Sequence, residues 1–255
     1  MLPWLSSPYP MFPSTSVALD SPNGLLAAGG ELSPVWLVEA YRRGIFPWYS
    51  DDDPILWWSP DPRMVLRPEQ FKLRRSLAKR LRNGGFDVTL NQHFEHVINA
   101  CAAPRDEDAG TWITDEMYNA YVTLHRLGIA HSIEVHQAGQ LVGGLYGLAM
   151  GPVFFGESMF SNVPDASKVA LAHLAFAMQA EGGKLIDCQM HTPHLQSLGA
   201  ATVARETFIN YLDQWLPEKA FSTSSSSDVP SVPASAWLSA IPSQSNPGGW
   251  QVQAN

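Results

Sequence analysis

A carboxylate, a thiol and an amide come directly after an apolar run late in the chain. The letters LI at residues 185–186 read as a short buried strand, and DCQ follows them. Burying a carboxylate such as that of Asp187 is costly unless it has a partner or a function. Because alternate residues of a strand face the same side, Asp187 and Gln189 would point to one place. The pattern predicts a polar pair that takes part in chemistry.

A second stretch, PVFFGESMFS at residues 152–161, supplies an apolar wall that an acid interrupts. Phe154 and Met159 belong to the wall, and Glu157 is the acid. By itself this stretch is typical of core packing around an acid with hydrogen-bond partners. Together with Asp187 and Gln189 it resembles an apolar pocket that contains a few convergent polar groups.

Other catalytic chemistries find less support. Cys188, His191 and His194 lie close in sequence, but no second cluster completes a structural zinc site and Pro193 stands between the histidines. A thiol that follows apolar strand residues is more often an inert small hydrophobe than a nucleophile. The chain also lacks a phosphate-binding glycine loop and a nucleophile-elbow serine. We therefore expect no metal and no cofactor.

The charge distribution is uneven. The net charge is −8, yet eight of the sixteen lysines and arginines lie between Arg63 and Arg82, where Glu69 is the one acid. That segment carries +7 and the rest of the chain −15. The basic segment is suited to a phosphate backbone and the acidic remainder to a cationic substrate, although a solvated charged face is the alternative.

The elements that must position these groups can be placed from caps and periodicity. Helices are expected over residues 34–43, 115–127, 166–180 and 205–215, with a short helix between Thr192 and Gly199. A β-meander is expected over residues 131–160, with its first hairpin at Ala138 and Gly139. At about 100° per residue, a further helix would carry on one face the basic side chains of Lys72, Arg75, Lys79 and Arg82.

The chain divides into three parts by composition. Residues 1–62 read as a small loop-rich domain, residues 63–216 as the main domain, and residues 217–255 as a serine- and proline-rich disordered tail. A docking motif that includes Trp237 is the alternative for the tail. Two cysteines fit a reducing compartment, the N-terminus does not resemble a secretory signal, and no apolar stretch reaches about 18 residues. A soluble, cytoplasmic protein is expected.

Several motifs stand in one order that resembles a known family. They are PNGLLAAGGELSP, AYRRGIFPWYS, ILWWSPDPR, GTWIT, LVGGLYGLAMG, FFGESMFS, ASKVALAHL, LIDCQ and HLQSLGA. From about Phe12 to Leu216 the chain is similar to the leucyl/phenylalanyl-tRNA protein transferases. The resemblance implies an α+β fold with mixed α/β content, in which a small N-terminal domain precedes a domain like that of the GCN5-type acetyltransferases. The glycine-rich pyrophosphate loop of those enzymes is absent, so the fold does not imply coenzyme A.

The resemblance also implies an activity. The family moves leucine or phenylalanine, and methionine less efficiently, from aminoacyl-tRNA to an N-terminal arginine or lysine, which marks the protein for N-degron degradation. Gln189 would orient the amine or the ester carbonyl, and Asp187 would polarise that network or relay the proton. Glu157 would lie at the rim of the aminoacyl pocket. The lining of that pocket would be Leu145, Phe154, Met159, Leu171, Leu174 and Ile186.

The tRNA would be held by stacking and by charge. By the resemblance, Trp48 and Trp112 sandwich the terminal adenine. The basic side chains expected on the tRNA backbone are Lys72, Arg75, Lys79, Arg80 and Arg82. We expect a monomer with no cofactor and no membrane partner. The alternatives are an acyl-CoA transferase on the same fold and a non-catalytic tRNA-binding module.

Overall fold

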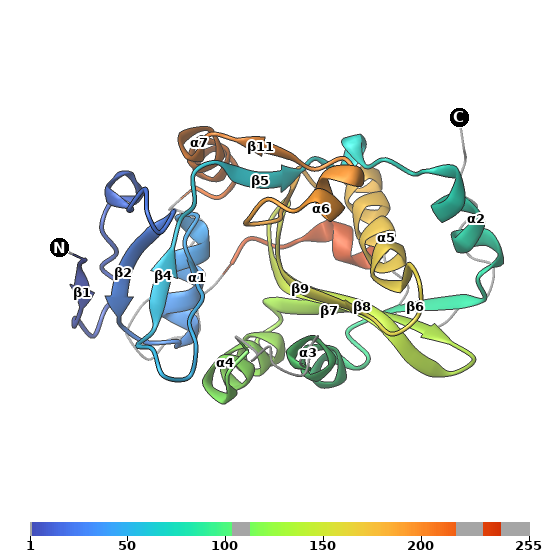
Figure 1. The fold of residues 1–255 in the computed structure, drawn as a ribbon, viewed down its shortest axis with the longest axis horizontal. Coiled ribbons are helices and arrows are strands. Elements are labelled where there is room, and N and C mark those ends of the chain that lie inside the picture. The colour runs from blue at the N-terminus through green and yellow to red at the C-terminus, as the bar shows by residue number, and fades with distance from the viewer. Residues whose placement is uncertain (1, 104–112, 218–231, 241–255) are drawn as a thin grey trace.

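Two β-sheets organise the chain in the computed structural model, which describes residues 2–103, 113–217 and 232–240 (Figure 1). The smaller sheet has the order β1-β2-β4-β3, and the larger has the order β11-β5-β10-β9-β8-β7-β6. The strands are β1 (Trp4–Leu5), β2 (Leu25–Gly29), β3 (Phe46–Pro47), β4 (Leu56–Trp58), β5 (Arg63–Leu66), β6 (Phe86–Leu90), β7 (Ala130–Gln137), β8 (Gln140–Met150), β9 (Val153–Ser161), β10 (Leu185–Asp187) and β11 (Ala201–Val203). The expected mixture of helices and sheets is confirmed.

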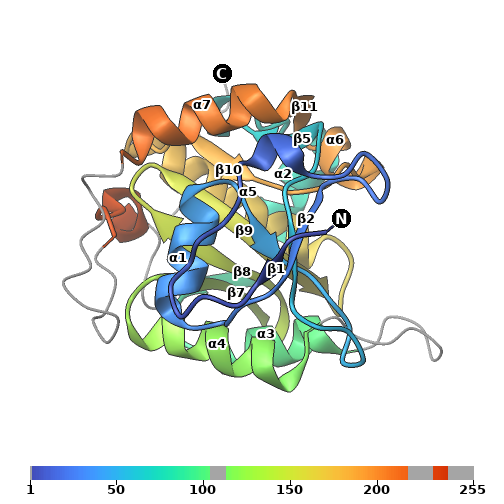
Figure 2. The ribbon, with the colours of Figure 1, turned by 90° about the vertical axis from the view of Figure 1, so that its left-hand side faces the viewer.

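Helices cover both faces of the larger sheet. The α-helices are α1 (Pro34–Arg42), α2 (Arg75–Asn83), α3 (Phe94–Ala102), α4 (Asp115–Arg126), α5 (Ala166–Ala180), α6 (Pro193–Ser197) and α7 (Arg205–Trp215). Short 3-10 helices are η1 (Thr15–Val17), η2 (Pro68–Gln70) and η4 (Ala236–Ala240). In Figures 1 and 2, α3 and α4 lie below the sheet and α5 lies above it.

An aromatic cluster holds the smaller sheet to α1. Trp57 of β4 is fully buried, and its ring packs edge-on against Phe12 with a centroid distance of 4.8 Å. Trp36 of α1 stacks on Trp57 at 6.1 Å and also contacts Phe12 edge-on. Aromatic pairs of this kind add about 0.5–1.5 kcal/mol to the burial of their apolar surface. The cluster fixes α1, whose C-terminal end carries Tyr41, against the rest of the molecule.

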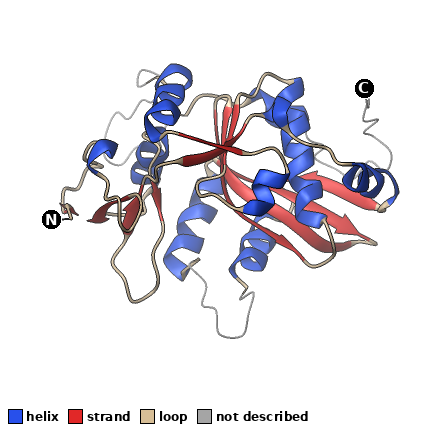
Figure 3. Cartoon of the chain, turned by 45° about the horizontal axis from the view of Figure 1, so that its top comes forward, coloured by secondary structure: helices blue, strands red, loops and turns tan. Residues whose placement is uncertain are grey.

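The larger sheet combines a meander with a crossover. Strands β7, β8 and β9 pair antiparallel, and the first hairpin turns at Ala138 and Gly139, both with positive φ. Helix α5 then connects β9 to β10, which lies parallel to β9. The helix approaches β8 so closely that a Cβ at Gly143 would lie 2.4 Å from the Cβ of Ala166. Figure 3 shows the sheets enclosed by these helices.

Residues 63–66 were assigned to a basic surface segment, but they form β5, a strand inside the larger sheet. This strand pairs antiparallel with both β10 and β11, and all four of its residues are buried. The first of them, Arg63, has no exposed surface. The prediction failed because Arg63 was counted by its charge, whereas Met64, Val65 and Leu66 after it are the apolar residues of a buried strand.

The predicted disorder of residues 217–255 is wrong for residues 232–240. This segment packs on the larger domain, where Trp237 of η4 is only 2% exposed. The indole Nε1 donates a hydrogen bond to the carbonyl of Gly151 at 3.0 Å. Burial of this large aromatic side chain removes apolar surface from water and so offsets part of the entropy lost when the segment becomes ordered. Ile241 and Trp250 of the same expected tail lie outside the described residues.

A search of the described residues for a helix with the length and apolarity needed to cross a lipid bilayer found none.

Candidate active site

A cavity of about 970 Å³ lies where the N-terminal residues meet the larger sheet. Its volume is in the range of small-molecule sites. The N-terminal side contributes Phe46, Pro47 and Trp48, and the polar lining includes Glu157 and Gln189. The apolar residues expected to receive the aminoacyl side chain all line it, namely Leu145, Phe154, Met159, Leu171, Leu174 and Ile186. Their role in substrate binding stays a prediction.

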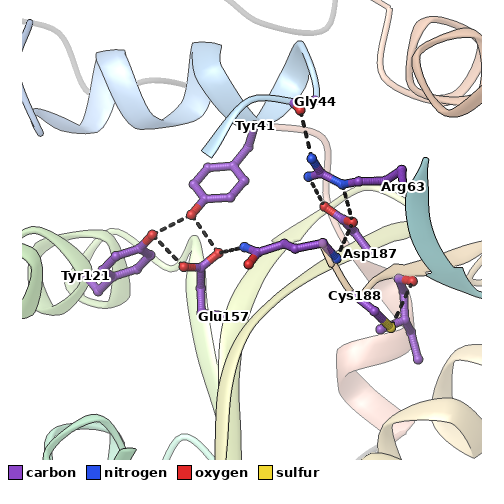
Figure 4. Close-up of polar contacts among 9 residues, drawn as sticks. Tyr41, Gly44, Arg63, Tyr121, Glu157, Asp187 and Cys188 are labelled. Atoms are coloured by element: carbon purple, nitrogen blue, oxygen red, sulfur yellow. Dashed lines mark hydrogen bonds and ion pairs between the residues drawn. The ribbon is translucent and has the colours of Figure 1, made fainter. Parts of the chain in front are cut away.

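Asp187 is paired with Arg63 at the inner end of β10 (Figure 4). The guanidinium Nε donates to Oδ1 at 2.8 Å and a terminal nitrogen donates to Oδ2 at 2.6 Å, with both side chains excluded from solvent. Arg63 also donates to the carbonyl of Gly44. Its guanidinium lies between the rings of Phe46 and Phe208, 4.8 and 4.7 Å from their centroids. The pair therefore joins the N-terminal residues to both β5 and β10.

The same carboxylate fixes the backbone of Gln189. The N–H of Gln189 donates to Oδ1 of Asp187 at 2.9 Å, and its carbonyl accepts from the N–H of Met64 at 3.1 Å. Gln189 has a φ of 59°, a left-handed conformation that is unfavourable for a residue with a side chain. Asp187 thus stabilises a backbone conformation that directs the side chain of Gln189 towards the cavity.

Gln189 contacts a carboxylate that two tyrosines also bind. Its Nε2 donates to Oε1 of Glu157 at 2.8 Å. Tyr41 donates to the same oxygen at 2.6 Å, and Tyr121 donates to Oε2 at 2.8 Å. Figure 4 shows these side chains arriving from α1, α4, β9 and the segment after β10. Four elements that are remote in sequence therefore meet at Glu157, which is one of the residues that line the cavity.

A count of protons indicates that Glu157 can hold one. The hydroxyls of Tyr41 and Tyr121 also contact each other, so three oxygen–oxygen contacts join the two tyrosines and Glu157. When both tyrosines donate to the carboxylate, the contact between their hydroxyls has no proton. A proton on Glu157 fills all three contacts if Oε2 donates to Tyr121, Tyr121 donates to Tyr41 and Tyr41 donates to Oε1.

The electrostatics of the site agree with that count. Burial raises the pKa of Glu157 to about 7, although the hydrogen bonds from Tyr41 and Tyr121 oppose this rise. Burial and the nearby Glu157 raise the pKa values of both tyrosines well above 10, so both remain protonated at neutral pH. Glu157 is therefore the group of this cluster that exchanges a proton near neutral pH.

Cys188 and His194 also line the cavity, but the donors to Glu157 among the described residues are Tyr41, Tyr121 and Gln189. Burial raises the pKa of Cys188 well above its ordinary value, which leaves it protonated, and its Sγ contacts the carbonyl of Ile186. His191 contacts the side chain of Gln196. The part of the chain that the structure describes contains no group of three or more histidines, cysteines and acids suited to a metal ion.

The residues expected to bind tRNA fall into separate groups. Trp48 lines the cavity and is 37% exposed. Trp112 lies outside the described residues.

Lys72 is exposed but precedes α2, which begins at Arg75, so the prediction of one helical face that includes Lys72 is wrong. The chain is held extended there because the N–H of Lys72 bonds to the carbonyl of Leu198.

Arg80 differs from its neighbours on α2. Its guanidinium lies over the ring of Phe86 at 4.9 Å and donates to the carbonyl of Pro164 at 3.0 Å. The side chain is thereby held against the protein, whereas those of Lys79 and Arg82 are exposed. We therefore expect Lys79 and Arg82 to be more available to a polyanion than Arg80.

No sequence pattern identified Arg63, Tyr41 or Tyr121 as part of the site. Tyr121 lies in the helix expected over residues 115–127, and Arg63 was expected only as part of a basic segment. The sequence did indicate that hydrogen-bond donors must exist, because buried carboxylates such as those of Asp187 and Glu157 need them. That requirement does not reveal which donors, because the partners lie 36 to 124 positions away.

The chain resembles proteins of one family over most of its length. A family model described as Leucyl/phenylalanyl-tRNA protein transferase matches residues 65–213, and one described as the N-terminal domain of that transferase matches residues 30–61. The Leucyl/phenylalanyl-tRNA--protein transferase of Chromohalobacter salexigens is 63% identical over 216 residues, which are 85% of this chain and 84% of that protein. The protein of the same name from Azoarcus sp. (strain BH72) is 58% identical over 218 residues, 86% of this chain and 92% of that protein.

Among solved structures, a GCN5-related N-acetyltransferase from Kribbella flavida covers 66% of this chain and 59% of its own length. The TM-score is 0.35 and the identity 13%.

Proposed function

The chain belongs to the leucyl/phenylalanyl-tRNA protein transferase family, and we propose on that basis that it transfers leucine or phenylalanine from aminoacyl-tRNA to the N-terminus of a protein. The observation that carries the proposal is the cavity in which an apolar wall meets Glu157 and Gln189. We further propose that methionine is transferred less efficiently and that the acceptor begins with arginine or lysine. The product would then enter N-degron degradation.

The apolar wall would receive the aminoacyl side chain. A hydrophobic pocket separates side chains that differ by one methylene by only about 1–3 kcal/mol, which fits the acceptance of both leucine and phenylalanine. Met159 lines the cavity, and a flexible thioether adapts to either shape. The acidic remainder of the chain, at −15 outside residues 63–82, favours an acceptor that carries positive charge.

The reaction joins an activated ester to an amine. The α-amine of the acceptor attacks the ester carbonyl, a C–N bond forms, and the C–O bond to the ribose of the tRNA breaks. The amine, with a pKa of about 7.7–8.0, must lose a proton as it attacks. A base with a pKa near the working pH suits that task, and Glu157 has a pKa of about 7. We assign that proton to Glu157, which would then return it to the departing ribose oxygen, so that the tRNA leaves with a free hydroxyl and Glu157 ends as it began.

Gln189 would orient the attacking amine. Its Nε2 is bonded to Glu157, and among the described residues none donates to its Oε1, which can accept a hydrogen bond from the amine. Asp187 acts through Gln189 and not as the base, because a proton on its carboxylate would leave the charge of the buried Arg63 uncompensated. Of the two roles expected for Asp187, the ion pair favours polarising and positioning the network.

The tRNA would be held outside this cluster. Trp48, on the cavity wall, would stack on the terminal base, and the exposed Arg75, Lys79 and Arg82 would contact phosphates. The free cysteines fit a reducing compartment, so we place the reaction in the cytoplasm. A monomeric state remains a prediction.

The test is direct transfer. The protein is mixed with radiolabelled phenylalanyl-tRNA and a peptide that begins with arginine, and label on the peptide is counted. A matched peptide with an acetylated N-terminus controls for attack by side chains. We expect label only on the free amine, and equal labelling of both peptides contradicts the proposal. Titration with coenzyme A, which we expect not to bind, separates this activity from acyl-CoA transfer.

A further inference from the structure

Residues 232–240 clamp the turn that leads into β9. The carbonyl of Pro233 accepts a hydrogen bond from the N–H of Gly151 at 2.8 Å. The carbonyl of Gly151 in turn accepts from the hydroxyl of Ser235 at 2.8 Å and from the indole of Trp237 at 3.0 Å. Gly151 lies between the last residue of β8 and the first residues of β9. Both backbone groups of Gly151, its N–H and its carbonyl, are thus hydrogen-bonded to this segment.

The indole of Trp237 supports a residue of the cavity wall. Its ring lies edge-on to that of Phe154, with a centroid distance of 5.9 Å and an interplanar angle of 82°. Phe154 lines the cavity and is itself only 2% exposed. The Phe154 ring therefore has the cavity on one side and Trp237 on another. Packed interiors have few voids, so the position of the ring depends on this neighbour.

Trp237 belongs to the same apolar cluster as the rest of the wall. This cluster contains Leu145, Leu171, Leu174 and Ile186, and Met159 packs against it. The contact of η4 with the molecule is mainly to α5, the helix that supplies two of those leucines. The family model ends at residue 213, so this support comes from outside the matched region.

We infer that Trp237 is a positioning residue that sets the depth of the side-chain cavity by holding the ring of Phe154 from behind. The inference rests on the proposed transfer of leucine and phenylalanine. Removal of the indole leaves space behind Phe154, and a partial collapse of that ring into the space deepens the cavity. A deeper cavity favours the larger phenylalanyl side chain over the leucyl side chain.

The experiment compares kcat/KM for phenylalanyl-tRNA and leucyl-tRNA in the full chain carrying Trp237→Ala. We expect the ratio to shift towards phenylalanine by about tenfold, the effect typical of a methylene-sized change in a pocket. Trp237→Phe keeps an aromatic ring behind Phe154 and should restore a ratio near that of the wild type. If Trp237→Ala does not fold, Trp237→Leu carries the same test, with a smaller shift expected.

The matched control is Trp36→Phe, which removes an indole from the separate cluster beside the smaller sheet. It should leave the ratio unchanged. An equal fall of kcat/KM for both tRNAs in the Trp237 variants shows a structural role alone and overturns the inference, although wild-type transfer stands. A wild type without any transfer overturns the proposed function and this inference with it.

Discussion

The guanidinium of Arg63 and the carboxylate of Asp187 form a two-point ion pair with no access to solvent. The residues are 124 positions apart in sequence, yet they determine the conformation of Gln189, whose N–H bonds to the same carboxylate. The site therefore depends on a pair whose carboxylate lies at the cavity but is held by Arg63 and by the N–H of Gln189. This arrangement separates effects on stability from effects on turnover.

Asp187→Asn should lower both stability and turnover. The substitution leaves the charge of Arg63 buried without a partner, which typically costs about 3–5 kcal/mol of the free energy of unfolding. Urea denaturation measures this loss. The control is Glu95→Gln, whose partner Arg126 is 72% exposed, so we expect less than about 1 kcal/mol there.

A double substitution separates the effect on stability from the effect on turnover. Replacing Arg63 by Met and Asp187 by Leu together should recover much of the lost stability, because apolar residues often replace a buried ion pair at little cost. Turnover should stay low, because the N–H of Gln189 has lost its acceptor. Recovery of turnover along with stability would remove Asp187 from the positioning role.

Glu157 should make the protein less stable as the pH rises to neutrality. Burial raises its pKa from an ordinary 4.5 to about 7, so the folded state binds the proton more tightly than the unfolded state. The resulting stabilisation is fully present below about pH 4.5 and is lost as the pH rises through 7. Between pH 5 and 8, wild-type stability relative to Glu157→Gln should fall by an amount on the order of 1–3 kcal/mol. Parallel stability curves for the two proteins would contradict the raised pKa.

Glu157 should also determine how the transfer rate depends on pH. If ionised Glu157 accepts the proton of the amine, kcat/KM rises as the pH passes through about 7. Glu157→Gln should lower kcat by about 10²–10⁴-fold and abolish that rise, while the limb due to the acceptor amine remains. Stopped assays on one acceptor peptide at several pH values provide the comparison. A variant that keeps the wild-type profile would exclude Glu157 as the base.

Trp48→Ala should weaken tRNA binding independently of the tRNA sequence. Stacking of a base on an aromatic ring contributes about 1–3 kcal/mol, which corresponds to a loss of roughly five- to 150-fold in affinity. Filter binding of several tRNAs measures it. Trp4→Ala is the matched control, because Trp4 is 65% exposed but does not line the cavity. Equal losses for the two variants would rule out a specific contact by Trp48.

Arg75→Ala combined with Lys79→Ala should reduce the salt dependence of tRNA binding. Each lost phosphate contact lowers the slope of log K against log salt by about 1. We expect a smaller effect from Arg80, which the ring of Phe86 and the carbonyl of Pro164 hold in place. Lys184→Ala, an exposed lysine remote in sequence from α2, serves as control. A slope that does not change would remove α2 from the interface.

The local features of the chain determined most of its elements. Pro34 follows Ser33 at the start of α1, and Thr114 caps α4 with a hydrogen bond to Met117, as their sequence patterns indicate. Thr192 caps α6 in the same way. Such caps involve residues two or three positions apart, so they can be read without tertiary contacts. The apolar lining of the cavity was likewise expected, but from the family resemblance.

Only the tertiary structure decided which polar groups meet. The sequence indicated that Asp187 and Glu157 needed partners, but Arg63, Tyr41 and Tyr121 reach them through long-range packing of β5, α1 and α4. The packing of Trp237 against the larger domain also depends on tertiary contacts. The serine-rich composition of residues 217–255 predicts disorder and does not indicate that this side chain is buried. Helix and strand propensities depend on a few neighbouring residues, whereas burial stabilises contacts between residues that are far apart in sequence. For that reason the elements could be read from the sequence and the proton-exchanging cluster could not.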